Sequence, residues 1–124
     1  MDETADLDRA ARSIIAGAAY DNNLLCIAEK QVFVVAAVFD AMMEAMDRAG
    51  AVRLTASEIE RLTAAAITTV GEGDARHDVP AKEFLGKDAC VLAQAAGRDV
   101  ASDTELLFGE TDESNPFVPV EQMM

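Results

Sequence analysis

Residues 20–30 read Tyr-Asp-Asn-Asn-Leu-Leu-Cys-Ile-Ala-Glu-Lys, and the pattern of the chain changes on either side of them. Before this stretch the apolar residues recur with a period near 3.6, which is typical of an amphipathic helix. After it, residues 31–36 form a run of apolar and β-branched side chains that predicts a buried strand. The polar triplet at 21–23 predicts a turn, because these short side chains compete for backbone hydrogen bonds. Cys26 is therefore expected on an irregular link between a helix and a core strand.

The composition indicates one folded domain, which we expect to cover residues 1–124. A chain of 124 residues is long enough for a single core, and its apolar fraction of 51% argues against disorder despite a net charge of −13. No apolar run approaches the ~20 residues needed to span a bilayer, and the acidic N-terminus is unlike a signal peptide. With 23 acidic against 10 basic residues, no nucleic-acid partner is expected. We expect a cytoplasmic protein without a membrane partner.

Helical and extended patterns alternate along the chain. Helices are expected over 4–19, 38–49, 56–67 and 81–96, the last with a break at Gly86, and strands over 31–36, 51–54 and 105–109. Thr-Ala-Ser-Glu at 55–58 is a capping box that opens the third helix. Residues 70–80 predict a polar loop, and 111–124 an irregular tail with two prolines. The alternation predicts an α/β fold with a mostly parallel sheet flanked by helices.

The segment 21–30 resembles the nucleophile segment of CoA-acylating aldehyde dehydrogenases, of the acetaldehyde and propionaldehyde type found in ethanolamine- and propanediol-utilisation microcompartments. The likeness continues through 31–35 and returns at 106–112 and 115–124. It departs at Leu25, where many relatives carry proline. The resemblance implies the catalytic-domain part of the aldehyde dehydrogenase fold, with residues 1–124 as a fragment of the nucleophile-bearing domain. We expect no NAD-binding domain within these residues, because no Gly-x-Gly-x-x-Gly loop follows a strand.

The resemblance also implies an activity. The parent enzyme would convert a short aldehyde, CoA and NAD to acyl-CoA and NADH, with no metal, whereas the isolated chain is expected to be inactive. Cys26 would be the catalytic nucleophile and would carry the acyl group as a thioester, which a second thiol can attack. Glu121 matches a glutamate that binds the nicotinamide-side ribose of the cofactor. A homo-oligomer in the cytoplasm or in the lumen of a bacterial microcompartment is implied as well.

These residues also have plainer structural interpretations. Free cysteine usually packs as a small hydrophobe, and Glu121 could be one more acid in an acidic tail. Cys90, at helical spacing among apolar residues, is expected in the core. His77 is expected in an exposed loop, and a single histidine without partners cannot build a metal site. The charged residues at 29–30 are expected to be ends of a structural ion pair or solvated groups.

Two other functions remain open on the sequence. A hydrolytic NAD(P)-dependent aldehyde dehydrogenase uses the same thioester but resolves it with water. The Asn-Asn-Leu-Leu-Cys run favours the CoA-acylating reaction over the hydrolytic one. A function of a different class is a non-catalytic module that buries an exposed apolar face by self-association.

Overall fold

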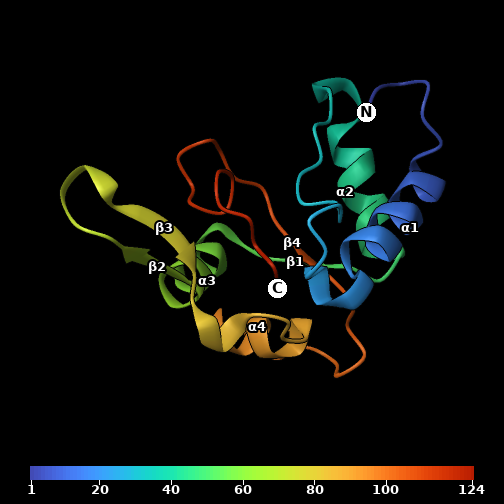
Figure 1. Ribbon diagram of the computed structural model, residues 1–124. Coiled ribbons are helices and arrows are strands. Elements are labelled where there is room, and N and C mark those ends of the chain that lie inside the picture. The colour runs from blue at the N-terminus through green and yellow to red at the C-terminus, as the bar shows by residue number, and fades with distance from the viewer.

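The computed structural model describes all residues from 1 to 124. Its four helices form two pairs, and Figure 1 shows the two pairs on either side of a short sheet. The helices are α1 (Leu7–Ala18), α2 (Phe39–Arg48), α3 (Ala56–Ala66) and α4 (Ala89–Ala95). α1 packs on α2, and α3 packs on α4. None of the four helices is long and apolar enough to cross a membrane.

The helix boundaries follow from local capping. α1 begins after Asp6, whose carboxylate accepts a hydrogen bond from the N–H of Arg9 at 3.0 Å. α3 begins with the predicted capping box, because Thr55 and Glu58 satisfy each other's backbone N–H groups. α2 ends before Gly50, whose φ of +98° closes the helix at little steric cost. The first three helices predicted from apolar periodicity are therefore confirmed, with ends that differ by at most three residues. Of the helix predicted over 81–96, only α4 is formed, and residues 82–84 form a short 3-10 turn instead.

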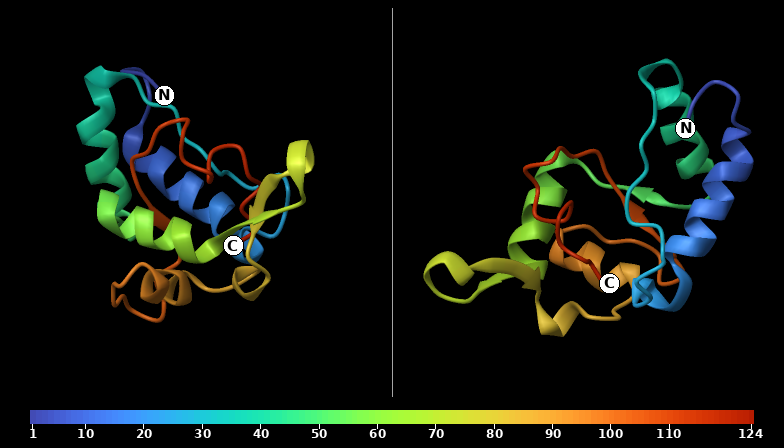
Figure 2. Two further views of the ribbon diagram at one scale, coloured as in Figure 1. Left: turned by 90° about the vertical axis from the view of Figure 1, so that its left-hand side faces the viewer. Right: turned by 45° about the horizontal axis from the view of Figure 1, so that its top comes forward.

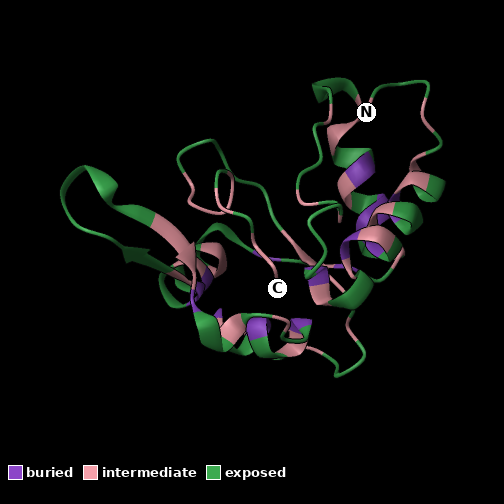
Figure 3. Cartoon of the chain, in the orientation of Figure 1, coloured by how far each residue is buried: buried purple, intermediate pink, exposed green.

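Each helix pair has its own apolar cluster. The cluster between α1 and α2 consists of Ala11, Ile15, Met42, Ala45, Met46 and Ala51. The cluster between α3 and α4 consists of Leu54, Leu62, Ala66, Leu92 and Ala96. Figure 3 shows the buried residues concentrated along these helix contacts. Only 16 of 124 residues are buried, so the hydrophobic effect stabilises the chain through two small cores.

A short parallel sheet joins the two halves. It consists of β1 (Val52–Arg53) and β4 (Leu107–Phe108), both predicted as strands. The N–H of Val52 donates to the carbonyl of Leu106 at 2.9 Å, and the N–H of Leu54 donates to that of Phe108 at 2.8 Å. The expected fold class, α/β with helices flanking a parallel sheet, is confirmed.

An antiparallel hairpin lies where the sequence predicted a polar loop. It is formed by β2 (Ile67–Val70) and β3 (His77–Pro80), with Ile67 opposite Pro80 and Val70 opposite His77. Figure 2 shows it projecting from the helix pairs. The prediction for 70–80 was therefore wrong over β3. The β-branched run Ile-Thr-Thr-Val favours a strand, and its pairing recruits the polar residues opposite.

The strand predicted over 31–36 is also absent. The segment is extended as far as Val35, and the carbonyl of Val35 accepts from the N–H of Val38 at 3.1 Å in the turn that follows. Its only backbone partner beyond that turn is Met1, which accepts from the N–H of Val35 at 3.0 Å and donates its terminal ammonium to the carbonyl of Phe33 at 2.7 Å. No hydrogen bond engages the backbone of Val32 or Val34. Apolar composition favours an extended chain, whereas a strand also needs a paired neighbour. Phe33 is 80% exposed as a result.

Candidate active site

The chain leaves α1 through a left-handed turn. Asp21, Asn22 and Asn23 have φ of +50°, +49° and +60°. L-residues rarely adopt this region, but Asn and Asp tolerate it because their short side chains can form local hydrogen bonds. The turn predicted from the polar triplet is confirmed. It leads directly into the loop at 24–29, which carries the cysteine.

Cys26 lies on the exposed part of that loop. Its thiol is free and solvent-exposed, so it is not packed as a small hydrophobe. The N–H of Ala28 donates to the carbonyl of Leu25 at 3.0 Å and tightens the loop around the cysteine. The loop links a helix to an extended segment, as predicted, although that segment is not a strand.

The loop is closed at its base by the side chain of Asn23. The Asn23 amide nitrogen donates to the carbonyl of Ala18 at 3.0 Å and to that of Glu29 at 3.4 Å. Its oxygen accepts from the ammonium of Lys30. Asn23 is the only buried polar or charged residue of the chain. These contacts join residues before and after the loop.

A shallow apolar cleft lies against the flank of the loop. It has a volume of about 320 Å³ and is formed between the end of α1 and the residues around the cysteine. Its lining comprises Ala16, Gly17, Tyr20, Leu25, Ile27, Ala28 and Glu29. Both neighbours of Cys26 contribute to it, although the cysteine itself does not. A small apolar group held there would lie beside the thiol-bearing loop.

Gly86 connects the turn before the loop to the C-terminal tail. Its carbonyl accepts from the side-chain amide of Asn22 at 2.9 Å, and its N–H donates to the carbonyl of Met123 at 3.0 Å. A second contact runs from the Gln31 side chain to the carbonyl of Val118 at 2.7 Å. Figures 1 and 2 accordingly show the C-terminus beside the segment that follows α1.

Glu121 lies in this tail, two residues before Met123. It is exposed, and its carboxylate has no hydrogen-bond or ion-pair partner within the chain. An exposed carboxylate can accept from two hydroxyl groups at once. The structure therefore brings the segments of Cys26 and Glu121 to the same region through Gly86.

A larger cleft of about 730 Å³ opens between the two helix pairs. Its lining is mostly apolar and includes members of both clusters, such as Met42, Met46, Leu62 and Leu92, together with Phe117 of the tail. Neither Cys26 nor Glu121 lines it. Cys26 thus lies outside this apolar space, although Asn23, Glu29 and Lys30 at the base of its loop contribute to the lining.

The charged residues at 29–30, expected as ends of an ion pair or as solvated groups, form no ion pair, and Glu29 is exposed. Lys30 contacts Asn23 instead, through both the side-chain and the backbone oxygen of that residue. The carboxylate of Glu29 lies over Gly17 of α1, where any side chain would collide with it. Sequence spacing gave no indication that the buried acceptor for Lys30 would be a neutral asparagine.

Cys90 and His77 lie away from the cysteine loop. Cys90 is half-buried on α4, and His77 is exposed at the start of β3, where its ring nitrogen Nδ1 lies 2.9 Å from the carbonyl of Ala75. His77 was predicted in a loop, and it lies instead at the first position of a strand. No group of three or more His, Cys, Asp or Glu side chains is arranged to hold a metal ion.

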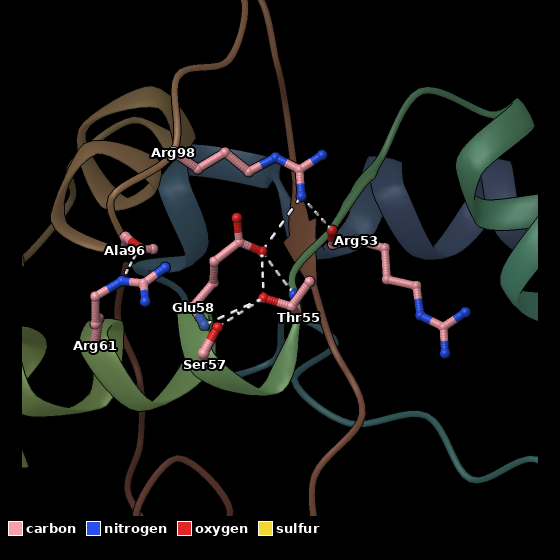
Figure 4. A network of polar contacts seen from close by, with 7 residues as sticks. All are labelled: Arg53, Thr55, Ser57, Glu58, Arg61, Ala96 and Arg98. Carbon is pink, nitrogen blue, oxygen red and sulfur yellow. Dashed lines mark hydrogen bonds and ion pairs between the residues drawn. The ribbon is translucent and has the colours of Figure 1, made fainter.

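A polar network fixes the start of α3 to the segment after α4 (Figure 4). One oxygen of Glu58 accepts from the N–H of Thr55 at 2.7 Å and from Arg98 at 3.4 Å. The N–H of Thr55, its hydroxyl and the charge of Arg98 hold the pKa of Glu58 below its usual value. Arg98 also donates to the carbonyl of Arg53 at 2.8 Å, and the network therefore supports β1.

Sequence comparisons identify relatives over the full length of the chain. No protein-family model matches it. The acetaldehyde dehydrogenase (acetylating) EutE of Salmonella typhimurium is 41% identical over 124 residues, which are 100% of this chain and 26% of that protein. The propanal dehydrogenase (CoA-propanoylating) of Citrobacter freundii is 42% identical over 125 residues, with 100% and 25% covered. The resemblance to CoA-acylating aldehyde dehydrogenases is confirmed. The chain spans about a quarter of the length of these relatives.

Solved acylating aldehyde dehydrogenases and a related reductase share the fold. The propionaldehyde dehydrogenase from the Clostridium phytofermentans fucose-utilisation bacterial microcompartment superimposes with a TM-score of 0.86, at 36% identity over 99% of this chain and 27% of that one. The Rhodopseudomonas palustris propionaldehyde dehydrogenase with bound CoA and an acylated cysteine gives 0.86, at 30% identity over 99% and 27%. An engineered glycolyl-CoA reductase with bound NADP+ also gives 0.86, at 30% identity over 99% and 26%.

Proposed function

We propose that this chain is the nucleophile-bearing part of the catalytic domain of an NAD-dependent, CoA-acylating aldehyde dehydrogenase. The observation that carries the proposal is the exposed Cys26, held on a closed loop. The chain that bears it aligns over its own full length with acylating dehydrogenases. A thiol on such a loop is accessible to a carbonyl carbon, whereas a cysteine packed in a core is not. A short aldehyde and CoA are the proposed substrates.

The chemistry suits a cysteine. The thiolate of Cys26 adds to the aldehyde carbon, and the carbonyl oxygen takes the negative charge. Nicotinamide, when bound, supplies the acceptor for the hydride that leaves this carbon. The carbonyl then re-forms as a thioester on Cys26. The thiolate of CoA attacks that thioester, and the Cys26 thiolate leaves. A serine ester would be a poorer acyl donor to a second thiol.

Glu121 is the proposed contact to the cofactor. Its exposed, unpaired carboxylate could accept hydrogen bonds from two ribose hydroxyls. The tail that carries it is tied through Gly86 to the turn that precedes the cysteine loop, so a cofactor bound there would lie near Cys26. The dinucleotide-binding domain would be contributed by a part of the enzyme beyond these 124 residues. A homo-oligomer in the cytoplasm or a bacterial microcompartment is the proposed context.

A chimera tests the proposal. Residues 1–124 would replace the aligned quarter of the Salmonella typhimurium acetaldehyde dehydrogenase. We expect the chimera to form NADH from acetaldehyde only when CoA is present, and Cys26→Ser to abolish this turnover. Cys90→Ser is the matched control and should retain it. A Cys26→Ser chimera that keeps its activity would show that the nucleophile is elsewhere, and NADH formation without CoA would indicate the hydrolytic reaction instead.

The exposed apolar segment favours a second candidate function, self-association. Ile27 is 84% and Phe33 80% exposed, and the unpaired backbone of Val32 and Val34 could pair with another chain. Sedimentation at increasing concentration would test it, with Phe33→Ser as the variant. Dimers that dissociate on this substitution would support an interaction module, and a monomer at all concentrations would exclude it.

A further inference from the structure

Asn23 has an environment unlike that of any other polar residue in the chain. This residue is only 5% exposed, whereas its neighbours on both sides are more accessible. Its backbone has a φ of +60°, which asparagine tolerates better than most residues. Burying an amide is unfavourable unless its hydrogen-bonding groups are satisfied. The contacts of Asn23 therefore determine whether this burial stabilises the loop.

Every polar group of the Asn23 side chain has a partner. The amide nitrogen donates to the carbonyl of Ala18, the last residue of α1, which has no acceptor role within the helix. It also donates to the carbonyl of Glu29, and its oxygen accepts from Lys30. One side chain thus bonds the chain before the cysteine loop and the chain after it. The residues 24–29 between these contacts include Cys26 near the centre.

We propose that Asn23 is a positioning residue for Cys26: its side-chain amide closes the loop and so limits the directions in which the thiol can point. The proposal rests on the proposed role of Cys26, although the closure itself is independent of it. Reaction with a bound aldehyde needs the sulfur and the carbonyl carbon within a narrow range of distance and angle. A loop whose ends are free samples many more conformations, so fewer of them place the thiol correctly.

Only an amide provides this set of contacts at this site. Aspartate has nearly the same shape and can still accept from Lys30, but it cannot donate to Ala18 or Glu29. Glycine accepts the left-handed backbone and removes all three contacts. Asn23→Asp therefore tests the loss of the two donated hydrogen bonds while the side-chain shape is retained. Asn23→Gly tests the loss of all three side-chain contacts while the backbone conformation is retained. Asn22→Gly is the matched control, because Asn22 has a similar φ but donates to Gly86 and Asp88 instead.

Amide hydrogen exchange of the chain itself tests the closure. Leu24 and Ala28 are the two residues of 24–29 whose N–H groups donate backbone hydrogen bonds. We expect exchange of these two amides to accelerate by about tenfold in Asn23→Asp and Asn23→Gly, the effect of losing roughly one net hydrogen bond. Asn22→Gly should change it by less than about threefold. Amides of α2 provide the internal control for global unfolding and should exchange as in the parent chain. Unchanged exchange of 24–29 in both Asn23 variants would overturn the proposal.

Turnover of the chimera separates positioning from the proposed function. In the Asn23→Asp chimera we expect kcat to fall by about tenfold or more with a KM for CoA near that of the unsubstituted chimera, because the thiol is present but less often aligned. If Cys26→Ser abolishes turnover while Asn23→Asp leaves kcat unchanged, positioning by Asn23 is wrong and the proposed function stands. If Cys26→Ser remains active, the proposed function fails and positioning fails with it.

Discussion

The side-chain amide of Asn22 donates to the carbonyl of Gly86 at 2.9 Å, across 64 positions of sequence. The N–H of the same glycine donates to the carbonyl of Met123 at 3.0 Å. One residue thus contacts both the turn that precedes the cysteine loop and the tail that bears the proposed cofactor contact. Gly86 has a φ of +65°, and a Cβ there would lie 3.1 Å from a methyl carbon of Leu24.

Replacing Gly86 should therefore cost more than replacing a comparable glycine. Gly73 has a φ of +54°, but a Cβ at that residue would have no other atom within 4 Å. Gly73→Ala therefore reports the backbone cost alone, roughly 1–2 kcal/mol. We expect Gly86→Ala to lose about 1 kcal/mol more, because the Asn22 contact and the Leu24 packing change as well. Urea unfolding of both variants measures the difference, and equal losses would show that the Gly86 contacts contribute nothing to stability.

The two cysteines should differ in their rate of alkylation. Cys26 is exposed on its loop, whereas Cys90 is half-buried on α4. We expect iodoacetamide to modify Cys26 first, since access to the thiol limits the reaction of a folded protein. Peptide mapping after short exposure identifies the labelled residue. In urea the two rates should converge, and faster labelling of Cys90 in the folded chain would contradict the assignment.

Serine substitutions at the same two cysteines should differ in their effect on the free energy of unfolding. Cys26→Ser replaces sulfur by oxygen at an exposed loop, and we expect the free energy of unfolding to change by less than ~1 kcal/mol. Cys90→Ser puts a hydroxyl on a partly apolar helix face, and a loss of ~1–3 kcal/mol is expected. Chemical unfolding of the two variants under one set of conditions measures both values. A larger loss for Cys26→Ser would mean that this thiol is packed.

The free energy of unfolding should decrease at low pH, and part of this decrease should depend on Glu58. Its pKa is lowered from the usual 4.5, chiefly by the backbone N–H of Thr55, then by the hydroxyl of Thr55 and by Arg98. A lowered folded-state pKa stabilises the fold above pH 4.5, and this stabilisation is lost as the pH falls through the folded-state pKa. Glu58→Gln should therefore flatten the decline of the urea midpoint below pH 4.5.

Glu60→Gln is the control for that experiment. Glu60 is an exposed acid on the same helix with no hydrogen bond to its side chain, so its removal changes the net charge equally. We expect this variant to keep the acid-dependent decline of the parent chain. Identical pH profiles for the two variants would show that the contacts of Glu58 do not contribute to the pH dependence.

The sequence predicted those parts of the fold that depend on neighbouring residues. The periodicity of α1, the capping box at Thr55 and the polar turn at 21–23 are local patterns, and all three are present in the structure. The strand over 31–36 was not formed, because pairing depends on residues distant in sequence. The hairpin of β2 and β3 was not predicted either, because the polar composition of β3 is typical of a loop and its strand conformation depends on pairing with β2.

In the candidate site, too, the local pattern could be predicted and the long-range contacts could not. The motif around Cys26 pointed to a nucleophile on a loop, and the loop is present. The roles of Asn23 and Gly86 could not be predicted, because each depends on a contact that only the folded chain creates. A glycine within an expected helix and an asparagine in a turn were the available signals. Neither indicates which carbonyl groups will lie within reach.

The pairing of β1 with β4 has a consequence for the order of folding. Each helix pair is built from segments that follow one another, whereas Val52 must find Leu107 across the whole of the second helix pair. Closing so long a loop costs conformational entropy before any contact compensates it. During synthesis on the ribosome, β1 emerges early and has no partner until β4 appears. We therefore expect the two halves to dock late, after each has collapsed around its own helices.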